Sequence, residues 1–316
     1  MWARWLGYDL LARHRPPLPR AALGGHVDLP RLREGGVGAV FFGLVSLPLR
    51  GAARAARAVD EQIDALEAAA AARPGELVLA HAAAEVEAAN RSGAVAGLLG
   101  IEGAHALGGD LDRLEHFARR GVRYLGLAHF SANEACYPAK GVGRRDDAGL
   151  TPFGAELVAR CEQRGVIVDL AHVNRAGFLD ACRLATRPPI VSHTGVLGAH
   201  EHWRNIDAVQ LRAVADRGGC IGIMFCPAFL GGPGIDRVVA HLRHIVDVCG
   251  EEAPALGSDW DGFIVPTPEL CDASRLPRLT EALLGSGLGE RAVGKILRGN
   301  ALRVLRDCPV PDRAGS

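Results

Sequence analysis

Two kinds of segment alternate along the chain from about residue 38 to residue 262. Amphipathic stretches with helical spacing lead through a glycine or proline break into short apolar runs. The runs are continuously apolar, which is typical of strands buried on both faces of a parallel sheet. The successive pairs of helix and strand are LDRLEHFARRG with VRYLGLAH, FGAELVARCEQRG with VIVDLAH, GFLDACRLATRP with PIVSH, DAVQLRAVADRGG with CIGIMF, and RVVAHLRHIVDVCGEEA with PALGSDWDG.

Two earlier apolar runs, GAVFFGLVS (38–46) and AVAGLLGIEG (94–103), bring the count to seven strands. An α/β barrel closes with eight strands, so the pattern is one strand short. The very short segment ELVLA, Glu76–Ala80, is the candidate for the eighth. The alanine-rich segment 52–73 predicts a surface helix. Because no linker-like stretch divides the 316 residues, we expect a single catalytic barrel domain over residues 1–316.

Charge and composition narrow the function classes. The 36 basic and 36 acidic side chains balance, so nothing steers the chain toward nucleic acid. No apolar run approaches the roughly 18 residues of a membrane span, and the first twenty residues lack the apolar core of a signal peptide. We therefore expect a cytoplasmic protein. The eight cysteines have no C-x-x-C spacing, which favours buried reduced thiols.

Five of the seven predicted strands finish in a side chain that can bind a metal or move a proton. The carboxyl ends of barrel strands meet at one face, so residues far apart in sequence are expected to lie together there. Two imidazoles and a carboxylate complete most of a zinc site, and a second carboxylate invites a second metal. A single such residue is more often merely hydrogen-bonded, so the hypothesis depends on their coincidence. The residues are Glu102, His129, His172, His193 and Asp259, with Asp261 beside the last.

Other polar residues receive weaker predictions. Asp169, three residues before His172, is expected to pack in the barrel or to accept the second ring N–H of a ligating histidine. His105 lies close enough to Glu102 for a similar supporting role. His241 and His244 are three apart on a predicted helix, a spacing that can chelate but that more often belongs to a solvated helix face.

A set of motifs occurs in order from His26 to the C-terminal GNALRVLR: HVDLPRLREGGVGAVFF, GLLGIEGAH, YLGLAH, GLTPFGAELVARCEQRGVIVDLAHVN, PPIVSHTG, WRNID and GSDWDG. In these motifs the chain resembles the membrane (renal) dipeptidase family of zinc peptidases. The resemblance implies a TIM-like (β/α)8 barrel of the metallo-dependent hydrolase type. It also implies hydrolysis of the peptide bond of dipeptides by a metal-activated water, two Zn²⁺ ions in the family, and a homodimer as the usual assembly.

The resemblance also implies roles for individual residues. Glu102 matches the carboxylate that bridges both metals, and His172 and His193 match the remaining protein ligands of one of them. Asp259 matches an aspartate close to the other metal that relays a proton. The other matches are His129, which steadies the tetrahedral intermediate, Arg204 of WRNID, which holds the substrate's terminal carboxylate, and Asn133, which lines the pocket.

The chain departs from the family at its front. The family carries a His-x-Asp pair for the second zinc at the end of the first barrel strand, whereas His26 and Asp28 belong to a later segment despite that spelling. Upstream of His26, the only segment that resembles His-x-Asp is GYD, Gly7–Asp9. Either the histidine has become Gly7 with Asp9 retained, or the pair lay before Met1 and the first strand is missing; the count of seven strands favours the second reading.

Two alternatives to a two-zinc dipeptidase follow. Without the pair, the second metal would keep only Glu102 and Asp259, too few ligands for a firm tetrahedral site, although one zinc could still activate water. The chain would then be a metal-deficient family member with weak or no activity. A hydrolase of other small amides or lactones on the same barrel is the other alternative. A missing strand would also leave a barrel edge unpaired.

Overall fold

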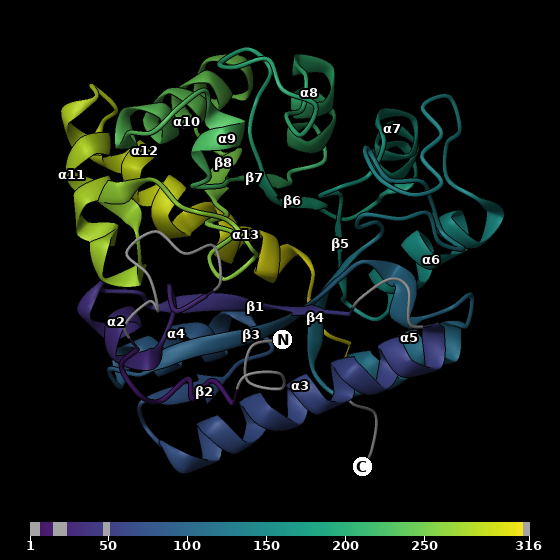
Figure 1. The fold of residues 1–316 in the computed structure, drawn as a ribbon, viewed down its shortest axis with the longest axis horizontal. Coiled ribbons are helices and arrows are strands. Elements are labelled where there is room, and N and C mark those ends of the chain that lie inside the picture. The colour runs from purple at the N-terminus through teal and green to yellow at the C-terminus, as the bar shows by residue number, and fades with distance from the viewer. Residues whose placement is uncertain (1–6, 15–23, 47–50, 312–316) are drawn as a thin grey trace.

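The fold is that of a computed structural model, which describes residues 7–14, 24–46 and 51–311. In these residues eight parallel strands form one curled sheet with helices on its outer side (Figure 1). The strands are β1 (Ala39–Val45), β2 (Leu77–Leu79), β3 (Val95–Glu102), β4 (Val122–Gly126), β5 (Ile167–Asp169), β6 (Ile190–Thr194), β7 (Cys220–Ile223) and β8 (Pro254–Leu256).

The helices alternate with the strands as the sequence pattern predicts. Five of them begin at a side-chain cap: Asp28 before α2, Asp110 before α5, Thr151 before α6, Asn174 before α7, and Asp207 with a full capping box before α8. The helices are α2 (Leu29–Glu34), α3 (Ala52–Ala72), α4 (Ala83–Arg91), α5 (Leu111–Arg119), α6 (Pro152–Gln163), α7 (Arg175–Leu184), α8 (Ala208–Ala215), α9 (Pro227–Leu230), α10 (Ile235–Cys249), α11 (Leu276–Gly285), α12 (Glu290–Gly294) and α13 (Asn300–Asp307), with short turns η2 (Ala104–Ala106), η3 (Pro268–Leu270), η4 (Ala273–Arg275) and η5 (Lys295–Gly299).

The strand order explains why the barrel is open. The sheet runs β1-β3-β4-β5-β6-β7-β8, so β1 and β8 are its ends, and no pairing joins them in the residues described. The segment Glu76–Ala80 does form a strand, β2, but β2 pairs only with the start of β3, beside this path. All seven apolar runs form strands. The α/β barrel prediction is confirmed, in the form of a curled barrel with a seam between β1 and β8.

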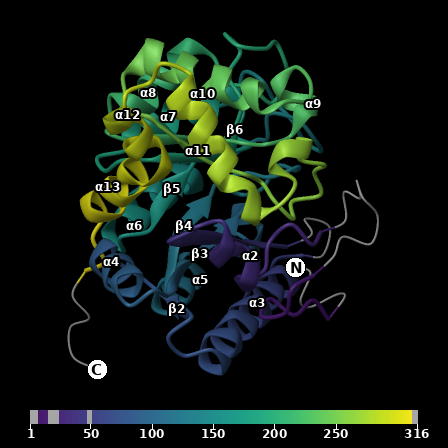
Figure 2. The ribbon, with the colours of Figure 1, turned by 90° about the vertical axis from the view of Figure 1, so that its left-hand side faces the viewer.

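Alternation along the strands divides the core in two. Outward residues such as Leu99, Leu125 and Ile221 pack with the helices in one large cluster. Their inward neighbours Leu98, Tyr124, Ile167, Ile190 and Cys220 form a second cluster. Residues of α4 and α13 join the inner cluster, and these two helices lie together near the starts of the strands (Figure 2). The opposite end, where the strands finish, is therefore left free for a site.

A cavity of about 1700 Å³ extends from that free end into the barrel. Its lining includes Glu102 and Trp203 at the mouth and Leu98, Ile190 and Leu305 deeper inside. A closed barrel fills its interior with layers of side chains, whereas the seam leaves this one hollow. Within the described residues, none of the helices combines the length and the apolarity that a bilayer crossing requires.

We predict that Gly100→Ala lowers the free energy of unfolding by about 1–3 kcal/mol, the usual cost of overpacking a core. The ring of Tyr124 covers this glycine of β3, and a Cβ here would lie 1.9 Å from a ring carbon. Gly294→Ala is the control, because a Cβ there meets nothing within 4 Å and φ is already −60°. Urea unfolding of both variants measures the difference; equal stability of the two would contradict the packing described.

Candidate metal centre

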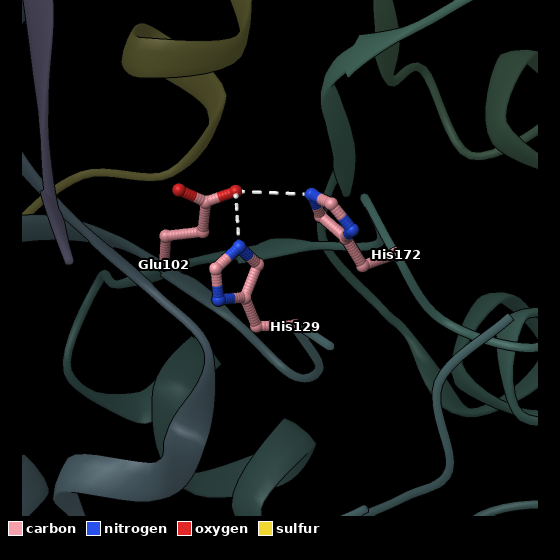
Figure 3. A group of neighbouring side chains, drawn as sticks. All are labelled: Glu102, His129 and His172. Carbon is pink, nitrogen blue, oxygen red and sulfur yellow. Dashed lines mark ion pairs between the residues drawn. The ribbon is translucent and has the colours of Figure 1, made fainter. Parts of the chain in front are cut away.

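The ends of three strands bring Glu102, His172 and His193 together at the mouth of the barrel. Glu102 is the last residue of β3, His172 follows β5, and His193 lies in β6. Nε2 of His172 lies 3.0 Å from Oε1 of Glu102, and Nε2 of His193 lies 3.4 Å from the same oxygen. The two Nε2 atoms are 3.0 Å apart. The carboxylate of Glu102 points between the rings of His129 and His172 in Figure 3.

These distances fit a single metal ion. Zinc bonds to imidazole and carboxylate are about 2.0–2.2 Å long, which places tetrahedral ligand atoms roughly 3.3–3.5 Å apart. The three distances between ligand atoms, 3.0, 3.0 and 3.4 Å, are close to those expected for a tetrahedral zinc site. Two imidazole nitrogens and a carboxylate oxygen are also ligands that zinc accepts. The side chains present can therefore hold a zinc-like ion.

His129 is the other candidate for third ligand, since it forms a compact group with Glu102 and His172. Its Nε2 lies 3.6 Å from Glu102, and its Nδ1 is buried without a hydrogen-bond partner. Nδ1 of His193, by contrast, lies 2.9 Å from the hydroxyl of Ser192. Because ligating histidines nearly always have a partner on the second nitrogen, His193 fits the ligand role better. His129 then faces the site as an N–H donor.

Two residues of the site have unusual backbone conformations. His172 has φ 66° and Asp259 has φ 59°, a region that residues other than glycine seldom adopt. Such conformations cost free energy and cluster at functional sites. Each residue lies three positions beyond its strand end, where the left-handed turn redirects the chain at the mouth of the barrel. Asp259 lines the same cavity as Glu102 and Arg204.

Burial determines the protonation of the cluster. It lowers the pKa of His172 and of His193 well below the ordinary value, with Arg204 acting in the same direction. Both rings are thus neutral, the form that binds metals. Burial also raises the pKa of Asp259 well above its usual range, and the charge of Glu102 adds to this. Burial also acts to raise the pKa of Glu102, but the nearby charges of His129 and Arg204 outweigh it and leave this pKa below its usual value.

The guanidinium of Arg204 is buried at the same mouth. The residue is 5% exposed, and one of its N–H groups donates to the carbonyl of His193 over 2.7 Å. Among the described residues no carboxylate forms an ion pair with it, while Asp259 and Glu102 lie near enough to favour its charge. A buried cation without an ion-pair partner is well suited to bind a carboxylate of a ligand.

The loop that carries Arg204 is tightly held. Across it, the N–H of Leu197 donates to the carbonyl of Ile206, and the N–H of Ile206 donates to the carbonyl of Gly195. The amide of Asn205 donates to the carbonyls of His200 and Phe229. The N–H of Val196 donates to Nδ1 of His241 over 2.9 Å. His241 is completely buried, so the prediction that it lies on a solvated helix face was wrong. Its ring instead anchors α10 to the loop.

Four other residues singled out by sequence lie elsewhere. Both groups of the Asn133 amide bond to its own loop, at Leu127, Ala135 and Cys136, and Asn133 is absent from the lining of the cavity. His105 bonds to Ser131 rather than to Glu102. The ring of His26 accepts the N–H of Asp261, and the carboxylate of Asp28 pairs with Arg31. The substrate contact of Asn133 stays a prediction, and its hydrogen bonds favour a role in loop structure.

The second metal site has few candidate ligands here. Asp9 is exposed, and its carboxylate accepts the N–H of Leu11 in a turn. In the part of the chain described, the cluster at Glu102 is the one group of three or more metal-binding side chains found. Sequence reasoning missed Ser192, whose hydroxyl lies beside His193, and Phe130, whose half-exposed ring lies 4.9 Å from that of His172. Serine and phenylalanine are common in proteins of every class, so neither residue could be identified as part of a metal site from the sequence.

A curled parallel barrel with carboxylate and imidazoles at the carboxyl ends of its strands defines a metal-dependent hydrolase. The chain belongs to the membrane dipeptidase family, peptidase family M19, whose family model matches residues 15–310. A metal is thus implied for this chain, as it is for the family.

Relatives and solved structures agree with this assignment. The chain is 34% identical over 310 residues to the dipeptidase tcpJ of Claviceps purpurea (strain 20.1), covering 94% of this chain and 72% of the relative. It is 31% identical to the dipeptidase verJ of Clonostachys rogersoniana, covering 89% and 75%. A crystal structure of the metallopeptidase dipeptidase AC matches with TM-score 0.83 and 30% identity over 90% of this chain and 89% of that one. A metallopeptidase from Rhodobacter sphaeroides matches with TM-score 0.83 and 28% identity over 90% of each chain.

We predict that acidification between pH 6.5 and about 4 weakens the fold through His241. Burial lowers the pKa of this ring from 6.5 to about 4. Between these two pH values the unfolded state binds a proton that the folded state does not, so the free energy of unfolding falls as the pH is lowered. The free energy of unfolding of wild type, relative to that of His241→Asn, should therefore fall by about 3 kcal/mol between pH 6.5 and pH 4. Urea unfolding at several pH values measures it, and a constant difference would contradict the prediction.

Proposed function

We propose that this protein is a zinc-dependent dipeptidase that hydrolyses the peptide bond of dipeptides through a metal-activated water. The observation that carries the proposal is the convergence of Glu102, His172 and His193 within 3.4 Å at the mouth of the barrel, beside the buried cation Arg204. Membership of the dipeptidase family supports the reaction class. The Rhodobacter structure, described as liganded with a phosphinate mimic of the dipeptide L-Ala-D-Ala, supports the substrate class.

The ligand set we propose is Glu102, His172 and His193. A bound zinc ion would supply a Lewis acid that polarises the substrate carbonyl and brings the pKa of a water close to neutral. Asp259, whose pKa burial raises, would accept the proton of the attacking water and pass it to the leaving amine. His129 would donate its Nε2–H to the oxyanion that develops on the substrate. Both residues lie in the same cavity.

Arg204 would determine which substrates fit. Its planar fork pairs with a carboxylate through two parallel hydrogen bonds, and burial strengthens that pair. A free C-terminal carboxylate bound here would hold the scissile carbonyl of a short peptide beside Glu102. The exposed rings of Phe130 and Trp203 line the same cavity and offer apolar surface to the substrate's side chains.

The number of zinc ions is one or two. Of the described residues, Glu102 and Asp259 are those we propose for a second ion, and two carboxylates make a weak site. We therefore propose one firmly bound zinc, with a second bound weakly. The alternative is that the protein is a metal-deficient member of the family with little or no catalytic activity. Zinc analysis of the purified chain, together with turnover of an L,D- or L,L-dipeptide, distinguishes the two.

We predict that Glu102→Gln and His172→Ala each abolish dipeptide hydrolysis and reduce bound zinc. Each variant removes one of three ligands from the proposed set. Glu156→Gln, on the exposed face of α6, is the matched control and should keep both. Zinc is measured by atomic absorption and turnover by release of the free amino acid. Unchanged turnover in either ligand variant would remove the metal-centre assignment.

We predict that the enzyme discriminates by about 30-fold or more in kcat/KM between a dipeptide and its C-terminal amide, because loss of a buried charged partner costs about 2–5 kcal/mol. Arg204→Met should erase this preference by losing activity on the free dipeptide. Kinetics with both substrates on both proteins test it. Equal rates of wild type on the two substrates would favour the alternative of a hydrolase for other small amides or lactones.

Three expectations of the sequence stay proposals: a cytoplasmic location, a homodimer, and one catalytic domain over residues 1–316. The eight cysteines are all free, which accords with a reducing compartment. Size-exclusion chromatography with light scattering would decide the oligomeric state.

A further inference from the structure

A chain of hydrogen bonds leads from the buried carboxylate of Asp169 to His193. The hydroxyl of Ser192 lies 2.7 Å from Oδ2 of Asp169 and 2.9 Å from Nδ1 of His193. Asp169 is completely buried, and its other oxygen, Oδ1, accepts the N–H groups of Ala171 and Ser192. The far nitrogen of His193, Nε2, is the one that faces Glu102.

The donors and acceptors in this chain can be assigned. Oδ1 of Asp169 accepts two backbone N–H groups, and these favour an ionised carboxylate that only accepts. The Ser192 hydroxyl then donates its single proton to Oδ2. Its oxygen is left to accept, so Nδ1 of His193 must carry a proton and donate it to Ser192. A neutral imidazole with its proton on Nδ1 has a lone pair on Nε2.

We propose that Ser192 and Asp169 are positioning residues that hold His193 in the tautomer protonated on Nδ1, so that Nε2 presents its lone pair to the metal. This inference rests on the proposed zinc site. It gives a specific function to Asp169, for which sequence alone left packing and histidine support as alternatives. It also gives a function to Ser192 of β6, which the sequence did not identify as a candidate site residue.

The position of Ser192 is fixed by tight strand packing. A Cβ at Gly222 or at Gly257 would lie 2.3 or 2.0 Å from the carbonyl oxygen of Ser192. Glycines on β7 and beyond β8 therefore let the backbone of β6 approach closely, and the hydroxyl is held between Asp169 and His193. Ser192 also lines the cavity.

The test compares three variants by zinc affinity and by the tautomer of His193. Ser192→Ala removes the acceptor for Nδ1–H, and we expect zinc to bind about 10–100-fold more weakly, as for other partners of ligating histidines. Ser192→Thr keeps the hydroxyl and should bind zinc nearly as wild type does. Affinity is measured by competition with a chromophoric zinc chelator.

Asp169→Asn separates positioning from strand structure. Its amide oxygen can still accept both backbone N–H groups, but its NH₂ donates to Ser192, which frees the hydroxyl proton for Nδ1 of His193. The tautomer should then reverse, and zinc affinity should fall at least as far as in Ser192→Ala. Nitrogen-15 NMR of the histidine rings in the metal-free protein reads the tautomer directly.

The outcomes distinguish the inference from the proposed function. Wild-type protein that binds no zinc overturns the zinc assignment, while NMR detection of Nε2–H on His193 in the metal-free wild type overturns the positioning role. Wild-type zinc affinity in Ser192→Ala and Asp169→Asn overturns the positioning role alone. A fall in affinity with Ser192→Ala and with Asp169→Asn, restored in Ser192→Thr, supports it.

Discussion

The oxygen of Glu102 and the two Nε2 atoms of His172 and His193 meet within 3.4 Å, on side chains that are at most 16% exposed. Buried polar groups need partners, and three acceptor atoms so close together repel one another unless a proton or a cation lies between them. Without a ligand ion, a ring proton must lie between these atoms, as in the contact of 3.0 Å between His172 and His193. Much of the surrounding structure can be understood as the support that keeps these three atoms together.

That support is distributed over elements far apart in the sequence. The end of β3 supplies the carboxylate, and a left-handed turn after β5 directs His172 toward it. Asp169 ties β5 to β6 through the backbone and hydroxyl of Ser192. The loop after β6 returns Arg204 against the carbonyl of His193, and His241 of α10 fixes the start of that loop. A site built on strand ends is more rigid than one built on loops alone.

The sequence predicted the parts of this fold that depend on periodicity. Continuous apolar runs identified the strands because both faces of each strand are covered, and strand-end residues identified the cluster because parallel strands end together. It could not predict contacts that depend on three-dimensional approach. His241 lies on the buried side of α10 because the loop after β6 needs an acceptor there, and nothing in the spacing of HLRH reveals that loop. Asn133 matches the family's motif, yet its amide is used by the turn that contains it.

The seam between β1 and β8 connects the fold to the metal count. β1 is half exposed along its length and pairs on one side only, with β3. In the family that the chain resembles, the His-x-Asp ligands of the second metal stand at the end of the strand before the segment that here contains β1. In the described residues the edge of β1 away from β3 has no strand partner, and no further group of three metal-binding side chains was found. We propose that the hollow barrel and the weakness of a second metal site share this one structural cause. The ligands that we propose on β3, after β5 and on β6 lie on the continuous part of the sheet.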